Sequence, residues 1–118
     1  MAHRAGGAVV AFHGVVRDHD DGRSVRGLEY SAHPSAARVL DLIVREELVR
    51  YGLHAAAASH RVGSLAVGET AFVVAVCATH RREAFEAAGR IVEETKSRLP
   101  VWKRQVFADG TEEWVHCP

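Results

Sequence analysis

Hydrophobic and polar positions change their spacing several times along this chain, and each change predicts a new element. Apolar residues recur every three to four positions over 34–51 and 80–99, which predicts two helices. Six short runs rich in β-branched and apolar residues are typical of strands: 9–16, 25–30, 53–62, 70–78, 101–107 and 114–115. The predicted order is strand, strand, helix, strand, strand, helix, strand, strand.

Turn signals lie between the predicted elements. Asp21-Gly22 and Asp109-Gly110 are typical of hairpin turns, and a slip of the alternation at Gly27 indicates a bulge. Since short turns join neighbouring strands, we expect one α+β domain over residues 1–118, with a largely antiparallel sheet and two helices packed on one face.

Residues at the helix ends predict their limits. Pro34 suits the first turn of the first helix, and Gly52 suits its end. Thr79 is a plausible N-cap for the second helix, and Pro100 should end it. The apolar stripe of this helix is expected to contain Phe85, Ala88, Val92, Thr95 and Leu99.

The composition of the chain argues against several classes of function. The 118 residues are 47% hydrophobic, enough for one core, and the formal net charge is zero. This balance argues against general binding to nucleic acid or to an anionic membrane. The longest apolar run, 71–78, is too short to span a bilayer, and the first residues are a poor match to a signal peptide. Cys77 and Cys117 are far apart, so we expect a reduced, cytoplasmic protein.

The two lysines are unusual in a chain that otherwise uses arginine. Lys96 and Lys103 are the only lysines among fifteen Lys and Arg residues, which leaves thirteen arginines. Lys96 falls on the flank of the predicted stripe, where we expect partial desolvation. Lys103 follows the break at Pro100, which should fold the chain back toward Lys96. Two amines in one pocket could act as acid, base or nucleophile, as arginine cannot. The alternative is two ordinary surface lysines.

The second helix begins with three cationic or potentially cationic residues, His80, Arg81 and Arg82. Such residues oppose the helix dipole, so they make sense if they converge on a phosphate; a solvated helix start is the other interpretation. Lys96 lies sixteen residues after His80, roughly 24 Å along one helix. If both belong to one site, that site is shared between two subunits.

Other reactive side chains have simpler explanations. The acids of the run RDHDDGR (17–23) lack the spacing of a calcium loop, so a solvated hairpin is expected, with Arg17 placed to face a pocket. The eight histidines have no metal-binding pattern. Cys77 with His80 could be a thiol and base, but Cys77 lies in an apolar strand and is expected to be a small buried hydrophobe.

Four runs taken together resemble the large, catalytic subunit of molybdopterin synthase. They are FHGVVRDHDDGRSVRGLEYSAHPSAA, HRVGSLAVGE, THRREAFEA and TKSRLPVWKRQVFADGTEEW. The resemblance implies an α/β-hammerhead-like α+β fold and a dimer with a small ubiquitin-like subunit at each end. It implies that sulfur passes from the small subunit's C-terminal Gly-Gly thiocarboxylate to a cyclic pyranopterin monophosphate. No metal or cofactor is implied for this subunit.

The resemblance also implies roles for particular residues. Lys96 and Lys103 match the two active-site lysines. The residues implied to bind substrate or line the pocket are Arg17, His80, Arg81, Arg104 and Gln105.

The chain departs from the family pattern in three places. Members usually have a further strand and helix before the first strand, and a basic tail after the position of Trp114. Gln105 stands where glutamate is usual. A non-catalytic paralogue that binds the small subunit or a pterin phosphate is therefore an alternative. A third interpretation is a sulfurtransferase that depends on Cys77 and works without a small subunit.

Overall fold

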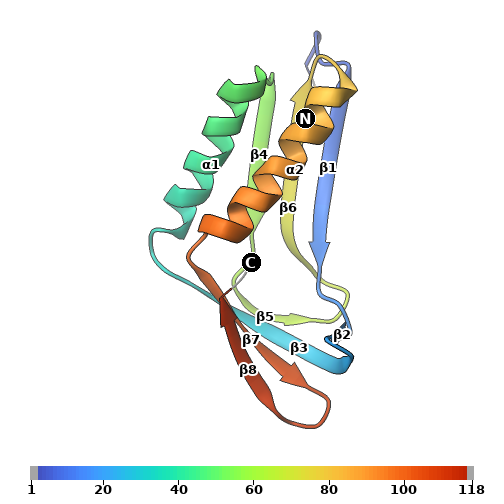
Figure 1. Cartoon of the computed structure of the whole chain (residues 1–118), viewed down its shortest axis with the longest axis vertical. Helices are drawn as coiled ribbons and strands as arrows, with labels where there is room; N and C mark the ends of the chain where they lie inside the picture. Colours follow the sequence, from blue (N-terminus) through green and yellow to red (C-terminus); the bar gives the residue numbers. More distant parts are fainter. Residues whose placement is uncertain (1–2, 117–118) are drawn as a thin grey trace.

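The computed structural model describes residues 3–116. These residues form eight strands and two α-helices in the order β1-β2-β3-α1-β4-β5-β6-α2-β7-β8 (Figure 1). No helix among them is both long and apolar enough to cross a membrane.

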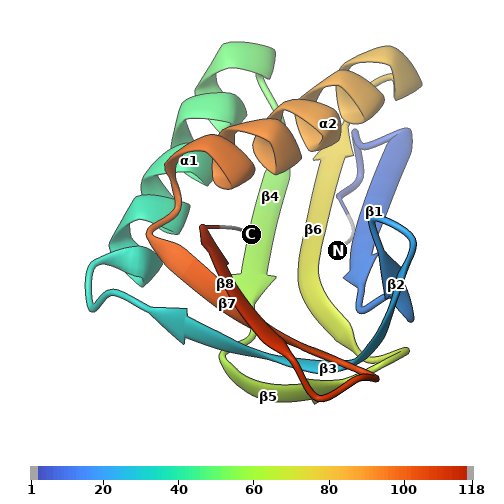
Figure 2. The ribbon, with the colours of Figure 1, turned by 60° about the horizontal axis from the view of Figure 1, so that its bottom comes forward.

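The first sheet has three antiparallel strands. β6 (Thr70–Ala78) lies between β1 (Ala8–Val15) and β4 (Ala55–His60). The helices α1 (Ala36–Tyr51) and α2 (Arg81–Arg98) pack side by side on one face of this sheet (Figure 2). The core lies between these layers, and several of its side chains have no exposed surface: Ile43, Val74, Val76 and Ile91.

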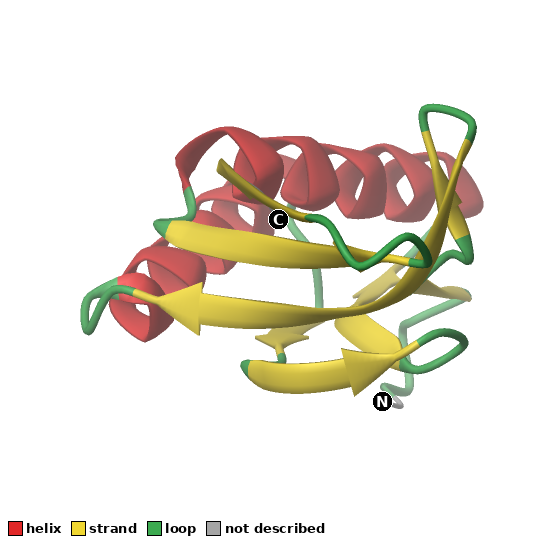
Figure 3. Ribbon diagram, turned by 90° about the horizontal axis from the view of Figure 1, so that it is seen from below, coloured by secondary structure: helices red, strands yellow, loops and turns green. Residues whose placement is uncertain are grey.

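The second sheet is built around β3 (Arg23–Ala32). On one side β3 pairs with β7 (Val101–Phe107), and β8 (Glu112–His116) continues the sheet beyond β7. The short strands β2 (His19–Asp20) and β5 (Gly63–Ala66) also pair with β3. Seen from below, the long strands of this sheet lie in the foreground with the helices behind them (Figure 3).

The α+β class, the antiparallel pairing and the two helices are as the sequence predicts. The division of the strands between two sheets was not predicted, because hydrophobic spacing does not say which distant strands pair. Residues 63–66 form the strand β5 instead of a turn alone; Gly63, with φ of +91°, reverses the chain directly after β4 so that β5 reaches β3.

The predicted turn and bulge are confirmed. Asp21 and Gly22 have φ values of 50° and 76°, the left-handed pair that a two-residue hairpin requires, and they join β2 to β3. The pairing of β3 with β7 slips between Val25 and Gly27. A Cβ added at Gly27 would lie 3.1 Å from the Leu65 carbonyl oxygen, so a larger residue would press on β5 there.

Both predicted helix starts were wrong by one or two residues. Ser35 is the N-cap of α1, so Pro34 precedes the helix, and His80 rather than Thr79 is the N-cap of α2. The Thr79 hydroxyl instead lies 2.8 Å from Nε2 of His54. The predicted ends are confirmed: Gly52 is the left-handed C-cap of α1, and α2 stops before Leu99-Pro100.

The predicted stripe of α2 included Phe85, which is 65% exposed and therefore outside the core. Ala84 and Ala87 are fully buried in its place. Small side chains let a helix approach its neighbours closely, so the packed face of α2 is rotated toward its alanines. Phe85 was expected on the packed face because its side chain is large and apolar.

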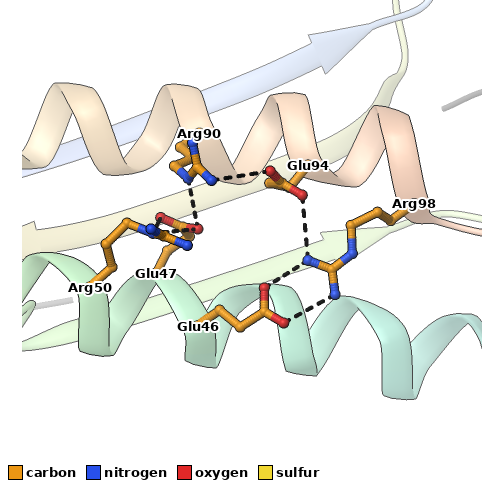
Figure 4. Close-up of polar contacts among 6 residues, drawn as sticks. All are labelled: Glu46, Glu47, Arg50, Arg90, Glu94 and Arg98. Atoms are coloured by element: carbon orange, nitrogen blue, oxygen red, sulfur yellow. Dashed lines mark hydrogen bonds and ion pairs between the residues drawn. The ribbon is translucent and has the colours of Figure 1, made fainter.

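A network of charged side chains joins the two helices (Figure 4). Glu47 has no exposed surface, and its carboxylate accepts hydrogen bonds from Arg50 and Arg90, each at 3.1 Å. Nearer the end of α2, Arg98 donates to both carboxylate oxygens of Glu46 at 2.7 and 3.1 Å. The hydrogen bond from Arg98 lowers the pKa of Glu46.

Candidate functional site

A small cavity of about 60 Å³ lies where the end of β1 meets β2, β3 and β7. It brings together three of the seven predicted site residues, Arg17, Lys103 and Gln105. The other residues that line it are Val15, Val16, His19, Asp20, Val25, Leu28 and Tyr30. Side chains far apart in the sequence therefore meet in one polar cavity.

The alternation of β7 directs Lys103 and Gln105 into this cavity. They share a strand face with Val101 and Phe107, which are 1% and 2% exposed. In the sheet, Lys103 lies directly opposite Tyr30 of β3. The lysine is thus held on a rigid strand, beside the core.

Arg17 is positioned by the residue before it. Val16 is 5% exposed, and its backbone N–H donates to the Glu69 carbonyl at 2.9 Å. Its carbonyl accepts from the Gly68 N–H, also at 2.9 Å. These two hydrogen bonds fix the backbone just after β1, so the side chain of Arg17 lies at the rim of the cavity.

The polar groups of the cavity are incompletely paired. Gln105 is 3% exposed, and its Oε1 has no hydrogen-bond partner among the described residues. Lys103 is half-buried and has no ion pair within residues 3–116. Arg17 lies 3.6 Å from Asp20, but both side chains are more than one third exposed, so this pair is weak. The cavity therefore offers a ligand cationic donors, the carboxylate of Asp20 and the unpaired Oε1 of Gln105.

Arg104 does not line this cavity. It alternates with Lys103 and Gln105 on β7, so its side chain lies on the opposite face of the sheet. There it forms ion pairs with Glu112 and with Glu29, the latter at 3.9 Å. The expectation that Arg104 and Gln105 share one pocket is not met by this geometry.

Lys96 lies in the last turn of α2 and is exposed, so the predicted partial desolvation is wrong for this chain alone. The inner position is taken by Thr95, which is fully buried. Beyond Leu99 the chain turns into β7, and the Pro100 carbonyl accepts from the His33 N–H at 3.0 Å. Lys96 is not among the residues that line the cavity.

His80 and Arg81 lie at the other end of α2, and both are exposed. The helix runs without a break from Arg81 to Arg98. The sixteen residues from His80 to Lys96 therefore correspond to about 24 Å. His54, which contacts Thr79, also stacks on His3 with ring centroids 4.3 Å apart, so imidazoles gather around this helix start.

The run 17–23 is a solvated hairpin, as expected. Asp18 and His19 are exposed and lie 2.8 Å apart, and the hydrogen bond with His19 lowers the pKa of Asp18. Within the described part of the chain, no group of three His, Cys, Asp or Glu side chains could hold a metal ion. Cys77 has no exposed surface and is a small buried hydrophobe, as predicted, while Cys117 lies outside the described residues.

The sequence did not indicate three polar residues of the cavity, His19, Asp20 and Tyr30. Tyr30 could have been found, because it alternates with Leu28 on the buried face of a predicted strand. His19 and Asp20 could not, because their role depends on how β2 folds against β3.

A wider groove of about 620 Å³ runs between α1 and β4. It is lined mainly by small apolar side chains and by His60. Burial lowers the pKa of His60, and its Nε2 has no partner among the described residues.

Comparison with known proteins gives the family of this chain. The family described as "MoaE protein" matches residues 1–98. The chain belongs to the MoaE family. It is 46% identical to the molybdopterin synthase catalytic subunit of Pyrococcus abyssi over 110 aligned residues. The aligned region covers 92% of this chain and 74% of the relative. The chain is 42% identical over 109 residues to the molybdopterin synthase catalytic subunit of Emericella nidulans, covering 92% of this chain but only 56% of the relative.

Two solved structures have the same fold as this chain. Molybdopterin synthase from Staphylococcus aureus has a TM-score of 0.89 at 32% identity, covering 97% of this chain and 83% of that one. A chain from the complex of subunits 1 and 2 of molybdopterin-converting factor of Helicobacter pylori has a TM-score of 0.74 at 19% identity, covering 96% and 73%. The second likeness concerns the fold alone.

Proposed function

We propose that this chain transfers sulfur from the C-terminal thiocarboxylate of a small ubiquitin-like partner to a cyclic pyranopterin monophosphate, in the biosynthesis of the molybdenum cofactor. The observation that carries the proposal is the cavity in which Arg17, Lys103 and the unpartnered Gln105 meet, in a chain of the MoaE family. The wider groove beside α1 has no comparable set of cations.

The chemistry needs cations and a proton donor. In each transfer, one carbon–sulfur bond forms on the pterin side chain, and water breaks the acyl–sulfur bond, so that the partner leaves as a carboxylate. In one transfer the carbon–oxygen bond of one phosphate ester breaks, so the cyclic phosphate opens and stays attached by its other ester bond. In the other transfer the displaced oxygen leaves as water. Two transfers make the dithiolene. Oxyanions that form in these steps are stabilised by positioned cations, and lysine can also donate or accept the proton.

We assign the roles by position. Lys103 acts in the cavity, and Lys96 joins it when a partner or a second copy covers the exposed end of α2. Arg17 binds an anionic group at the rim. His80 and Arg81 bind the substrate phosphate. Arg104 is left out, because its side chain lies on the other face of β7.

We propose that two copies form each site. His80 and Lys96 are at opposite ends of α2, so one small substrate cannot contact both within one chain. The face of the first sheet that points away from the helices supports a dimer, because apolar side chains lie exposed on it beside His13 and Ser59. Val9 and Val15 on it are 53% and 49% exposed, and Ala11, Ala75 and Ala57 form a row across the three strands. Exposed apolar surface of this kind is typical of protein contacts.

The partner is a small ubiquitin-like subunit, so the full assembly is a heterotetramer. The Helicobacter pylori relative in fold is described as a complex of two different subunits. The same proposal places the protein in the cytoplasm, where its pterin substrate and reduced Cys77 would be found.

The decisive experiment mixes the chain with a thiocarboxylated small subunit and the pterin precursor, and measures dithiolene product. We expect product from the unaltered chain and a large loss in Lys96→Ala and Lys103→Ala. The exposed Arg45, which pairs with Asp41 at 2.8 Å on α1, supplies a control in Arg45→Ala. Partner binding without product would instead support the non-catalytic paralogue. Product without any small subunit, lost in Cys77→Ser, would support the third interpretation.

A further inference from the structure

Gln105 is a polar side chain with an unused acceptor in the interior. It is 3% exposed, and its Oε1 has no hydrogen-bond partner among the described residues. A buried amide oxygen without a partner is unfavourable, and such groups are rare in folded proteins. Its persistence beside a cavity is explained if a ligand supplies the missing donor.

The neighbours of Gln105 define what that ligand must be. On β7 it shares a face with Lys103, two residues away, and both line the cavity with Arg17. Lysine and arginine only donate hydrogen bonds, so they require acceptors, whereas Oε1 of Gln105 requires a donor. The ligand group must therefore carry an anionic acceptor and an N–H close together.

The size of the cavity limits the group further. At about 60 Å³, the cavity has about one tenth of the volume of the groove beside α1. A space this narrow favours a slender group, such as a terminal peptide unit without a side chain, over a fused ring system. Such a peptide unit also carries both required features, since its end is anionic and its backbone nitrogen is an N–H donor.

We propose that Gln105 is a positioning residue whose Oε1 accepts a hydrogen bond from the last backbone N–H of the partner's C-terminal tail, beside Lys103. This inference rests on the proposed function and assigns one contact within it. Because the amide is neutral, it holds the tail without adding a second carboxylate to that of Asp20, which lines the same cavity. A carboxylate about 7 Å away on the same strand face would favour the protonated lysine.

A double-mutant cycle tests the contact directly. The partner is prepared in its carboxylate form with either the native last amide or an ester in its place, which removes only the N–H. Both forms are titrated against the unaltered chain and against Gln105→Met, a near-isostere. We expect each single change to weaken binding about tenfold and the two together to weaken it little more. Additive losses would overturn the proposal, since Oε1 would then bind only water.

The pH dependence of sulfur transfer separates this role from a structural one. Gln105→Glu keeps an acceptor oxygen, so replacing the last amide of the tail by the ester should still weaken binding about tenfold, as in the unaltered chain. Its negative charge opposes the anionic end of the tail in both forms alike. Its added carboxylate should move the pH profile of sulfur transfer to higher pH, because a nearby negative charge favours the protonated form of a cationic group. An unmoved profile would contradict the placement beside Lys103. If the unaltered chain binds no partner at all, both the proposed function and this inference fail. If the partner binds equally well to the unaltered chain and to Gln105→Met, only this inference fails.

Discussion

Polar side chains are paired with one another at the interface between the two helices, but two of those in the cavity beside β7 lack such pairing within residues 3–116. At the interface Glu47 is fully buried and receives hydrogen bonds from Arg50 and Arg90. In the cavity Lys103 and Gln105 have no such partners among the described residues. A satisfied polar network specifies packing, whereas unsatisfied groups in a concave place indicate a site for a ligand. The comparison separates residues that hold the fold from residues that would act on substrate.

The largest effect should come from the cavity. Lys103→Ala should lower the rate of product formation by about 10²- to 10⁴-fold, because it removes a positioned acid–base group. Thermal unfolding should change little, since no ion pair within residues 3–116 is lost. Initial rates and melting curves on the same samples check both statements. A rate within threefold of the unaltered chain, with Arg45→Ala as the control, would remove Lys103 from the mechanism.

The opposite result is expected at the helix interface. Glu47→Ala should lower the free energy of unfolding by about 2–4 kcal/mol, because it breaks a buried network and leaves a cavity. The rate per folded molecule should stay near that of the unaltered chain. Denaturant unfolding measures the loss, and Glu93→Ala, at an exposed position of α2, is the matched control. An equal loss in both variants would show that the network adds no stability.

Two glycines extend the comparison to the backbone. Gly22 has φ of 76° in the hairpin beside the cavity, so Gly22→Ala should destabilise by about 1 kcal/mol and reduce activity by moving His19 and Asp20. Gly89 lies within α2, and a Cβ there would meet nothing within 4 Å. Gly89→Ala should therefore stabilise by about 0.5–1 kcal/mol. A Gly22→Ala variant as stable as the unaltered chain would show that the turn geometry does not constrain Gly22.

The smallest effect concerns pH. Burial lowers the pKa of His60 from 6.5, so the unfolded chain binds a proton more readily than the folded chain. Stability should consequently fall as the pH drops below about 6.5 toward the lowered pKa of the folded state. Chemical denaturation between pH 7 and pH 5 measures this, and His60→Gln should flatten that part of the curve. An unchanged slope in the variant would assign the acid sensitivity to other groups.

The sequence predicted what local spacing and turn chemistry determine. Asp21-Gly22, the bulge at Gly27 and the end of α2 at Leu99-Pro100 were all found, because each depends on neighbouring residues. The pairing of β5 with β3 depends on residues about 35 positions apart, so no local pattern indicates it. Phe85 was misplaced because the tight packing of Ala84 and Ala87 is a property of the assembled layers.

The site was predicted in part for the same reason. Arg17, Lys103 and Gln105 do line one cavity, because strand alternation and the end of β1 place them there. Arg104 could have been separated from them by the same alternation. The exposure of Lys96 could not have been foreseen, since its surroundings depend on how α2 meets β7 and on what covers this end of the helix.

The central claim is that one chain holds only part of the site. It is tested most directly with mixed dimers of a His80→Ala chain and a Lys96→Ala chain, carrying different tags and purified by both. Each variant alone should form almost no product. The mixed dimer should recover about half of the unaltered activity, because one of its two sites then combines an intact Lys96 with an intact His80 from the other copy. Mixed dimers as inactive as the single variants would contradict the account.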